Sequence, residues 1–388
     1  MFNFKTLSIG YLFVIISLFF YSFTQVDLSL TLSEASWWQT VQKFFQQIGY
    51  FNRPLSAVLY SVIVISMFTF YILFLKLARV NLINKKQLWI LILITTAILT
   101  FSYNAFSYDL FNYIFDAKIV TFYQQNPYIH KALDYLGDPM LSFMHWTHRY
   151  YPYGPIWLAL TIPLSYIGFN VFLPTFFMFK ILTSVCFLGT AYFIGKILKI
   201  VSPKKEVLGI AFFALNPLVL IESLVSSHND ISMMFLAIFA VYLALMNKYI
   251  FSLISILLSV GIKFATGILI PVFLLFFIQK KNISKEGFLN ILFFAMFIPL
   301  ILVVIRTNFQ PWYLMLILPF ASLIPSKSYA MGAGLILSFF ALAQYLPYIY
   351  IGDWNEPIPQ ILLWLTIGGF LIYLFYCSIA RLLNWDRK

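Results

Sequence analysis

The residues best suited to chemistry gather in one polar stretch, 107–155, of an otherwise apolar chain of 388 residues. It holds four of the thirteen acidic residues and three of the four histidines. Asp109 comes near its start, directly after an apolar run, and Asp116 follows two helical turns later. Because that spacing returns to the same side of a helix, we expect both carboxylates on one helix face.

The position of Asp109 predicts a carboxylate at the boundary between a hydrophobic region and water. Partial burial there should raise the pKa of the carboxyl group and make it a better general base. An isolated Asp at a helix start is also a common cap, and two charges on a solvated helix face are common as well. The pair alone therefore leaves a structural and a catalytic interpretation open.

Aromatic turns flank these carboxylates. The sequence Asn126-Pro127-Tyr128 and the run 151–155, which contains Tyr153, combine tyrosine with proline or glycine. Such sequences favour turns, and tyrosine is typical of membrane interfaces. We expect Asn126, Tyr128 and Tyr153 either to line a substrate cleft or to form an interfacial aromatic belt.

A second polar group is His228-Asn229-Asp230, which lies between two apolar runs. Polar residues at the mouth of two membrane helices are costly unless they are solvated or used. Helix capping accounts for one of the three, not for all. We expect His228, Asn229 and Asp230 to contact substrate, although the spacing does not specify a zinc site.

Lys263 and Arg306 form the third group, two cations that are each isolated among apolar residues. They are either anchors that extend to the membrane surface or ligands for the phosphate of an anionic lipid. Gln310 follows within the sequence Phe309-Gln310-Pro311-Trp312-Tyr313 and adds an amide beside this charge.

Composition identifies the elements that must position these groups. Hydrophobic residues make up 62% of the chain, charged residues 10%, and the mean hydropathy is +0.89. We predict an all-α polytopic membrane protein, a bundle of about 12 transmembrane helices in a single domain, 1–388. The predicted crossings are 6–23, 54–75, 88–106, 172–195, 207–225, 231–246, 249–262, 264–278, 288–305, 311–324, 329–350 and 358–380.

The segments between crossings carry the predicted site. External segments are expected at 24–53, 107–171, 226–230 and 306–310, with interfacial or re-entrant helices in 107–171. Residues 156–170 contain Pro163 and are too few for a full crossing, which needs about 20 apolar residues.

We attribute the net charge of +12 to the membrane topology and not to a nucleic-acid partner. Lysines and arginines in the short loops fall on one side of the predicted bundle, which the positive-inside rule assigns to the cytoplasm. Both termini are then expected in the cytoplasm, and the site on the external face of the cell membrane. The chain has no nucleotide-binding motif, so an activated donor should arrive within the membrane.

In order, these motifs resemble the GT-C superfamily of integral-membrane glycosyltransferases. The resemblance is closest to the polyprenol-phosphomannose-dependent mannosyltransferases and their bacterial and archaeal relatives, over about 106–318. It rests on Ser107-Tyr108-Asp109, Phe115-Asp116, Asn126-Pro127-Tyr128, Asp138-Pro139, the run 151–155, His228-Asn229-Asp230, Lys263 and 309–313. Where these relatives often have Asp-Gly, this chain has Asp116-Ala117.

The resemblance implies transfer of a mannose-like hexose from a polyprenyl-phosphate donor to a hydroxyl of a glycan or lipid acceptor, with inversion, outside the membrane. It assigns Asp109 as the general base. Lys263 and Arg306 would then stabilise the phosphate, while Asp116, His228 and Asp230 position sugar or acceptor. No cofactor is required; the external carboxylates suit a divalent cation, but no ligand set is specified.

Two other classes of protein fit many membrane helices. A transporter or flippase of a lipid-linked sugar would keep its activity when Asp109 is neutralised. A non-catalytic scaffold for polysaccharide assembly would bind a partner and turn over no donor. The lack of a visible internal repeat and the scarcity of ionisable residues at predicted mid-membrane depth count against a transporter.

Overall fold

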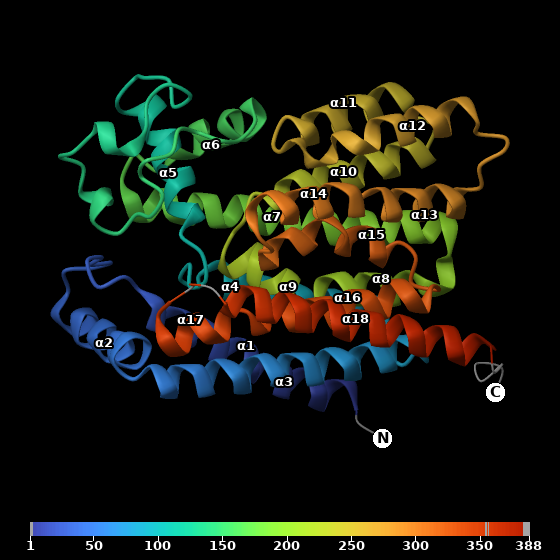
Figure 1. Ribbon diagram of the computed structural model, residues 1–388, viewed down its shortest axis with the longest axis horizontal. Coiled ribbons are helices and arrows are strands. Elements are labelled where there is room, and N and C mark those ends of the chain that lie inside the picture. The colour runs from blue at the N-terminus through green and yellow to red at the C-terminus, as the bar shows by residue number, and fades with distance from the viewer. Residues whose placement is uncertain (1–2, 354, 356, 383–388) are drawn as a thin grey trace.

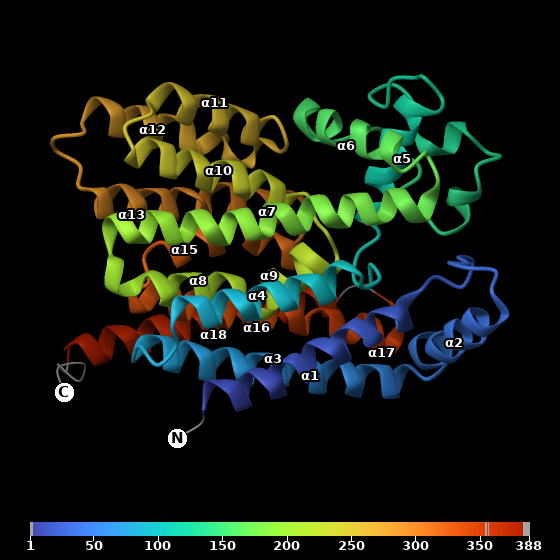
Figure 2. The same ribbon diagram turned by 180° about the vertical axis from the view of Figure 1, so that it is seen from behind.

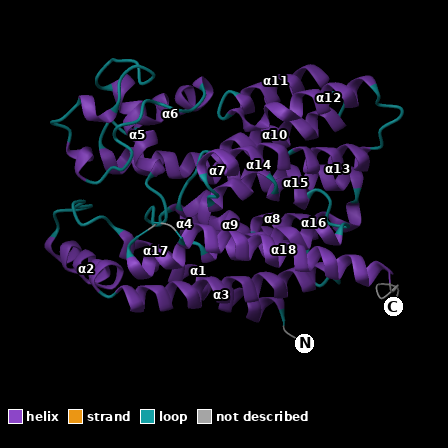
Figure 3. Ribbon diagram, in the orientation of Figure 1, coloured by secondary structure: helices purple, strands orange, loops and turns teal. Residues whose placement is uncertain are grey.

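Helices form all the regular structure in the part of the chain that the computed structural model describes, residues 3–353, 355 and 357–382. Most run along the long axis of the molecule (Figures 1 and 3). Six are long and apolar enough to cross a membrane, which confirms an all-helical membrane protein. They contain α1 (Phe4–Ser22), α3 (Arg53–Arg79), α7 (Phe172–Val201), α13 and α14 (Lys285–Ala295, Phe297–Thr307), α16 and α17 (Ser328–Ala343, Tyr345–Ile351), and α18 (Ile358–Leu382).

A seventh span is possible only as a broken helix. Pro203–Ala214, which comprises η5 (Pro203–Lys205) and α8 (Glu206–Ala214), meets Pro217–Val225 at an angle of 55°. The second piece comprises α9 (Pro217–Leu220) and η6 (Ile221–Val225). Pro217 has no backbone N–H and begins the new helix, and the side chain of Asn216 accepts a hydrogen bond from the N–H of Leu218 at 2.9 Å.

The expected number of about twelve crossings is not confirmed, because several apolar runs fold into helices shorter than a span. These are α4 (Lys85–Thr100), α10 (Asp230–Leu245), α11 (Tyr249–Val260), α12 (Leu269–Ile278) and α15 (Leu318–Ser322). Hydropathy does not record where a helix breaks. The predicted crossings 249–262 and 264–278, for example, contain helices of only 12 and 10 residues, because the turn at Gly261 and the 3₁₀ helix η7 (Phe264–Ile268) take up the residues between them.

The basic loops gather at one end of the bundle. The turns between α3 and α4, between α7 and α8, and between α12 and α13 lie at the same end, at the left in Figure 2. They carry the clusters Lys76 to Lys86, Lys196 to Lys205 and Lys280 to Lys285. Their common placement agrees with the predicted order of crossings. The assignment of that end and of both termini to the cytoplasm remains a prediction. Residues 1–2 and 383–388 lie outside the described part of the chain.

The opposite end carries short helices and the long loops. α2 (Ser36–Gln46) lies there, preceded by η1 (Phe23–Gln25) and followed by η2 (Gln47–Phe51), and so do α5 (Asp109–Thr121) and α6 (Pro155–Ile167) (Figure 1). Between α5 and α6 the chain forms only η3 (Ala132–Asp134) and η4 (Pro139–Ser142). With 13 residues α6 is too short to span a membrane, as predicted for 156–170, and it packs against α5 and α7.

Candidate active site

Helix α5 places the two predicted carboxylates on one face. It begins at Asp109, whose backbone N–H donates to the hydroxyl of Ser107 at 3.2 Å, and a carboxylate in the first turn suits the positive end of the helix dipole. Asp109, Asn112 and Asp116 follow a spacing of three and four residues, so all three face the same side. The predicted sharing of one face is confirmed, since all three line one pocket.

This pocket lies between α5 and the loop that follows it. Aromatic side chains and one arginine form its other walls, and Asp109 and Asp116 are its only carboxylates among the described residues. The Arg149 guanidinium lies 4.2 Å from the centre of the Trp146 ring, a cation–π contact that holds it in place. The complete lining is Asp109, Asn112, Asp116, Ala132, Met144, Trp146, Arg149, Tyr150, Pro152 and Tyr153.

Behind Asp109 lies a buried histidine between two carboxylates. His228 Nδ1 is 3.5 Å from Asp109 Oδ2, and His228 Nε2 is 3.3 Å from Glu222 Oε2. Its ring stacks on Trp312 of η8 (Pro311–Leu316) with 4.3 Å between ring centres. Burial lowers the pKa of His228, but the two carboxylates outweigh it and raise the pKa to about 9. The imidazolium is therefore the form present at neutral pH.

The pKa values of the two carboxyl groups in the pocket are shifted in opposite directions. Burial raises the pKa of Asp109, yet contact with His228 and the charges of Lys263 and Arg149 outweigh it, and the pKa lies below its usual value. The predicted rise is therefore wrong, because the lowering charges are close. Burial and the negative charge of Asp109 raise the pKa of Asp116 well above its usual range. The pKa values of two carboxyl groups in one site are thus pushed apart, an arrangement typical of active sites.

The segment that carries His228 has unusually many unpaired polar atoms. Among the described residues no hydrogen-bond partner exists for Ser226 Oγ, Ser227 Oγ or Asn229 Nδ2, although all are buried. Ser227 also adopts a left-handed backbone with φ of 53°. Buried polar groups without partners and strained backbone are both concentrated at functional sites.

Lys263 is paired within the protein. Its Nζ donates to Asp230 Oδ2 at 2.8 Å and lies 5.9 Å from the centre of the Tyr153 ring. The turn at Gly154 brings these residues together, since its N–H donates to the carbonyl of Ile262 at 3.0 Å. A Cβ at Gly154 would lie 2.1 Å from the carbonyl oxygen of Gly261, so only glycine allows this approach.

A buried lysine ties the His228 segment to the bundle. Lys180 of α7 donates from Nζ to the hydroxyl of Ser102 at 3.1 Å, to the carbonyl of Val225 at 3.0 Å, and to the carbonyl of Leu224. The two carbonyls end η6, where a helix leaves its acceptors unpaired and carries partial negative charge. Lys180 therefore fixes the start of the segment that presents His228.

Replacing Lys180 with Met should destabilise the protein by about 1–3 kcal/mol, because two buried carbonyls lose their donor. Thermal unfolding of detergent-purified protein would measure this as a lower melting temperature. The control is Lys199→Met, a change of the same kind at an exposed position of the same helix. Equal melting temperatures for Lys180→Met and the wild type would contradict the structural role.

Residues 15–279, well over half of the chain, match the MptA_B family, described as alpha-(1->6)-mannopyranosyltransferase, N-terminal domain. The chain belongs to this family. The glycosyltransferase class and the mannosyltransferase resemblance predicted from the order of motifs are therefore confirmed. Comparisons with curated proteins and with solved structures give no match. The match begins within α1, earlier than the predicted region of resemblance, and ends just after α12.

Several predicted site residues of this mannosyltransferase lie outside the pocket lining. Asn126 Oδ1 accepts from the N–H of Tyr128 at 3.0 Å and so shapes a turn, while the Tyr128 hydroxyl donates to the carbonyl of Tyr153 at 3.1 Å. Arg306 is exposed in the last turn of α14, and Gln310 directly precedes η8. Neither Arg306 nor Gln310 lies within 15–279.

Sequence reasoning assigned no role to several residues of the candidate site, among them Arg149, Glu222 and Lys180. Arg149 stands among aromatic residues in a loop, where a single arginine gives no signal of its own. Glu222 is visible beside the His228 motif, but its contact with the imidazole is not. Lys180 did carry a signal, because a lone lysine within an apolar run is expensive to bury unless it is used.

Proposed function

We propose that this protein transfers a mannosyl group from a polyprenyl-phosphate donor to an acceptor hydroxyl, with inversion, and that Asp109 is the general base. The observation that carries the proposal is the ionised carboxylate of Asp109, which faces a pocket and pairs with a buried imidazolium. The family supports mannosyl transfer. The lack of a nucleotide-binding motif in the sequence supports a lipid-linked donor.

The reaction balances with the groups present. Asp109 takes the proton of the acceptor hydroxyl while the hydroxyl oxygen attacks the anomeric carbon. The bond from that carbon to the phosphate oxygen breaks, its electron pair leaves with the phosphate, and polyprenyl phosphate is released. A single displacement from the opposite face inverts the anomeric centre and needs no glycosylated enzyme residue.

The leaving phosphate requires a cation, and Arg149 suits this role better than Lys263. Lys263 is already neutralised by Asp230, whereas Arg149 forms no ion pair with any described residue. Its guanidinium lines the same pocket as Asp109, and arginine binds phosphate oxygens through paired hydrogen bonds. Phosphate binding there also offsets a charge that lowers the pKa of Asp109, so the donor itself would make the base stronger.

Asp116 and the aromatic walls would hold the sugar. Burial and the charge of Asp109 raise the pKa of Asp116, so its carboxyl group holds a proton more readily than that of Asp109, and in that form it would donate a hydrogen bond to a sugar hydroxyl. Tyr153 and Tyr150 line the same space. Bound sugars are commonly held by such a combination of flat apolar surface and a few polar groups.

The proposal is tested with the full chain reconstituted in nanodiscs and supplied with polyprenyl-phosphate mannose, polyprenyl-phosphate glucose or neither. Mass spectrometry would follow released polyprenyl phosphate together with the glycosylated acceptor. We expect release that depends on both donor and acceptor, with mannose preferred. Movement of intact donor between leaflets without any release would overturn the transferase assignment and favour a flippase.

Replacing Arg149 with Gln should raise the KM for the donor about tenfold to a hundredfold, because a charge-assisted hydrogen bond to phosphate contributes about 1.5–3 kcal/mol. The KM for the acceptor should change little. Steady-state kinetics with each substrate varied in turn would separate the two. Arg306→Gln is the matched control, and a larger effect there than at Arg149 would return the phosphate site to Arg306.

A further inference from the structure

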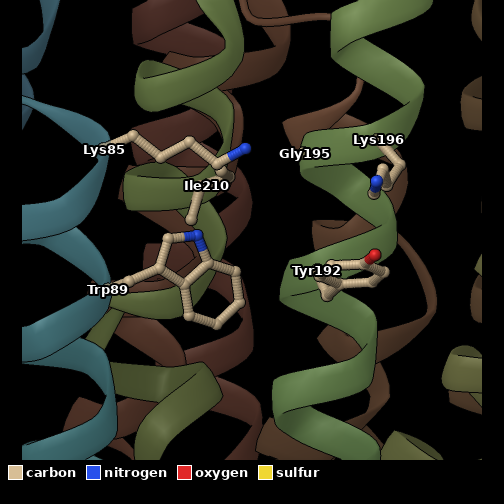
Figure 4. Close-up of a pocket in the computed structure, with 6 residues that line it drawn as sticks. All are labelled: Lys85, Trp89, Tyr192, Gly195, Lys196 and Ile210. Carbon is tan, nitrogen blue, oxygen red and sulfur yellow. The ribbon is translucent and has the colours of Figure 1, made fainter.

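A second cavity lies at the basic end of the bundle, away from the active site. It has a volume of about 250 Å³ and opens between α4, α7 and α8. Figure 4 shows Lys85 and Trp89 on one side and Tyr192 and Lys196 on the other. Nothing in the proposed transfer reaction uses these residues, so the cavity needs a separate explanation.

The polar ends of four side chains meet around this space. The Lys85 Nζ pairs with Glu206 Oε1 at 2.5 Å, and the Lys196 Nζ lies 5.2 Å from the centre of the Tyr192 ring. No carboxylate lies within ion-pairing distance of Lys196 in the described part of the chain. The ammonium group of Lys196 is therefore available to a ligand. The hydroxyl of Tyr192 lies beside it, and the indole N–H of Trp89 lies across the cavity (Figure 4).

The floor of the cavity is apolar and depends on a glycine. Gly195 and Ile210 form it. A Cβ at Gly195 would lie 2.8 Å from the Ile210 side chain and 3.4 Å from Glu206 Oε1, so any larger residue would fill the space or push α8 away from α7. The cavity thus combines cations and hydrogen-bond donors at its rim with a hydrocarbon base.

An apolar surface continues from the cavity toward the middle of the bundle. On α4, Leu93 lies one turn deeper than Trp89 and is 49% exposed. On α7, Val185 lies two turns deeper than Tyr192 and is 58% exposed. Both helices are part of an apolar bundle, and exposed aliphatic side chains at this depth contact acyl chains.

We propose that this cavity binds the headgroup phosphate of an anionic phospholipid, with its acyl chains along α4 and α7. A free soluble phosphate would use the rim alone and would gain nothing from the apolar surface below it. The surrounding turns carry many lysines, which attract anionic lipids to this end of the molecule. Trp89 and Tyr192 are of the residue types that lie at the headgroup level of membranes.

The test is native mass spectrometry of delipidated full-length protein titrated with phosphatidylglycerol. The wild type should retain one lipid tightly, and Lys196→Gln should bind it about tenfold more weakly, since it loses a charge-assisted hydrogen bond to the headgroup phosphate. Lys196→Arg should restore binding. Lys199→Gln, an exposed lysine on the same helix that does not line the cavity, should bind like the wild type.

Other outcomes would overturn the proposal. Equal retention of phosphatidylcholine would show that the headgroup charge is not recognised. Displacement of the bound lipid by glycerol 3-phosphate at matched concentration would identify a soluble phosphate as the ligand instead. Unchanged binding by Lys196→Gln, with its thermal unfolding also unchanged, would place the lipid elsewhere. None of these results depends on glycosyl transfer, so the lipid site and the proposed reaction are tested separately.

Discussion

Replacing Asp109 with Asn should lower turnover of the polyprenyl-phosphate donor about a thousandfold and leave the fold intact, because a positioned general base contributes about 10²–10⁴ in rate. Asparagine matches the shape of the carboxylate but accepts no proton from the acceptor hydroxyl. Released polyprenyl phosphate, measured by mass spectrometry in nanodiscs, reports the turnover. Asp134→Asn, an exposed carboxylate of the same loop, should behave like the wild type.

A comparison with Asp116 sharpens this prediction. Because burial and the charge of Asp109 raise the pKa of Asp116 well above its usual range, Asp116 is the less suitable base. The Asp116→Asn variant would keep a neutral hydrogen-bond donor of similar shape. Its loss of turnover should be far smaller than that of Asp109→Asn. Full turnover by Asp109→Asn, or equal losses at the two positions, would remove Asp109 from the role of base.

Local sequence spacing predicted the parts of the site that lie within one helix. Asp109 and Asp116 share a face because a helix repeats every 3.6 residues, whatever surrounds it. The sequence also indicated that His228-Asn229-Asp230 does more than cap a helix, since three polar residues at a helix mouth exceed the needs of capping, and His228 does lie against Asp109. Both inferences use only neighbours in the chain.

Tertiary contacts decided what the sequence did not reveal. The pKa of Asp109 falls because His228, Lys263 and Arg149 approach it from distant parts of the chain. The burial of Asp109 was predicted correctly, and burial alone would raise its pKa. The nearby positive charges lower the pKa by more, and only the fold determines where those charges lie. Hydropathy also did not reveal that the predicted crossing 207–225 breaks at Asn216-Pro217, because both sides of the break are apolar.

Replacing Glu222 with Gln should move the alkaline limit of activity to lower pH. Glu222 is one of two carboxylates that hold the pKa of His228 at about 9 against the effect of burial. Without its charge, burial and the remaining contact with Asp109 oppose each other, and the pKa should return to near the ordinary 6.5. At pH 8.5 about one imidazole in a hundred would then be protonated, so a reaction that needs the imidazolium beside Asp109 should slow about a hundredfold.

The Glu222→Gln variant removes the negative charge of this side chain but keeps its shape. Glutamine keeps an oxygen that can accept the hydrogen bond from the Tyr345 hydroxyl, which lies 3.0 Å from Glu222 Oε1. The measurement is the pH profile of kcat between pH 5 and about 10, with Glu286→Gln, an exposed glutamate paired with Lys327, as the control. An alkaline limb that stays in place would mean that Glu222 does not hold the imidazolium.

The protonation of His228 should also make the stability of the fold depend on pH. The pKa of His228 in the folded protein, about 9, lies above its ordinary value of 6.5. Its protonation therefore stabilises the fold fully below pH 6.5, and this contribution is lost as the pH rises through about 9. The melting temperature of the wild type should fall over that window, whereas that of Glu222→Gln should vary much less. Parallel curves for the two proteins would show that His228 is not charged in the folded state, and the electrostatic support of Asp109 would then have to come from Lys263 and Arg149 alone.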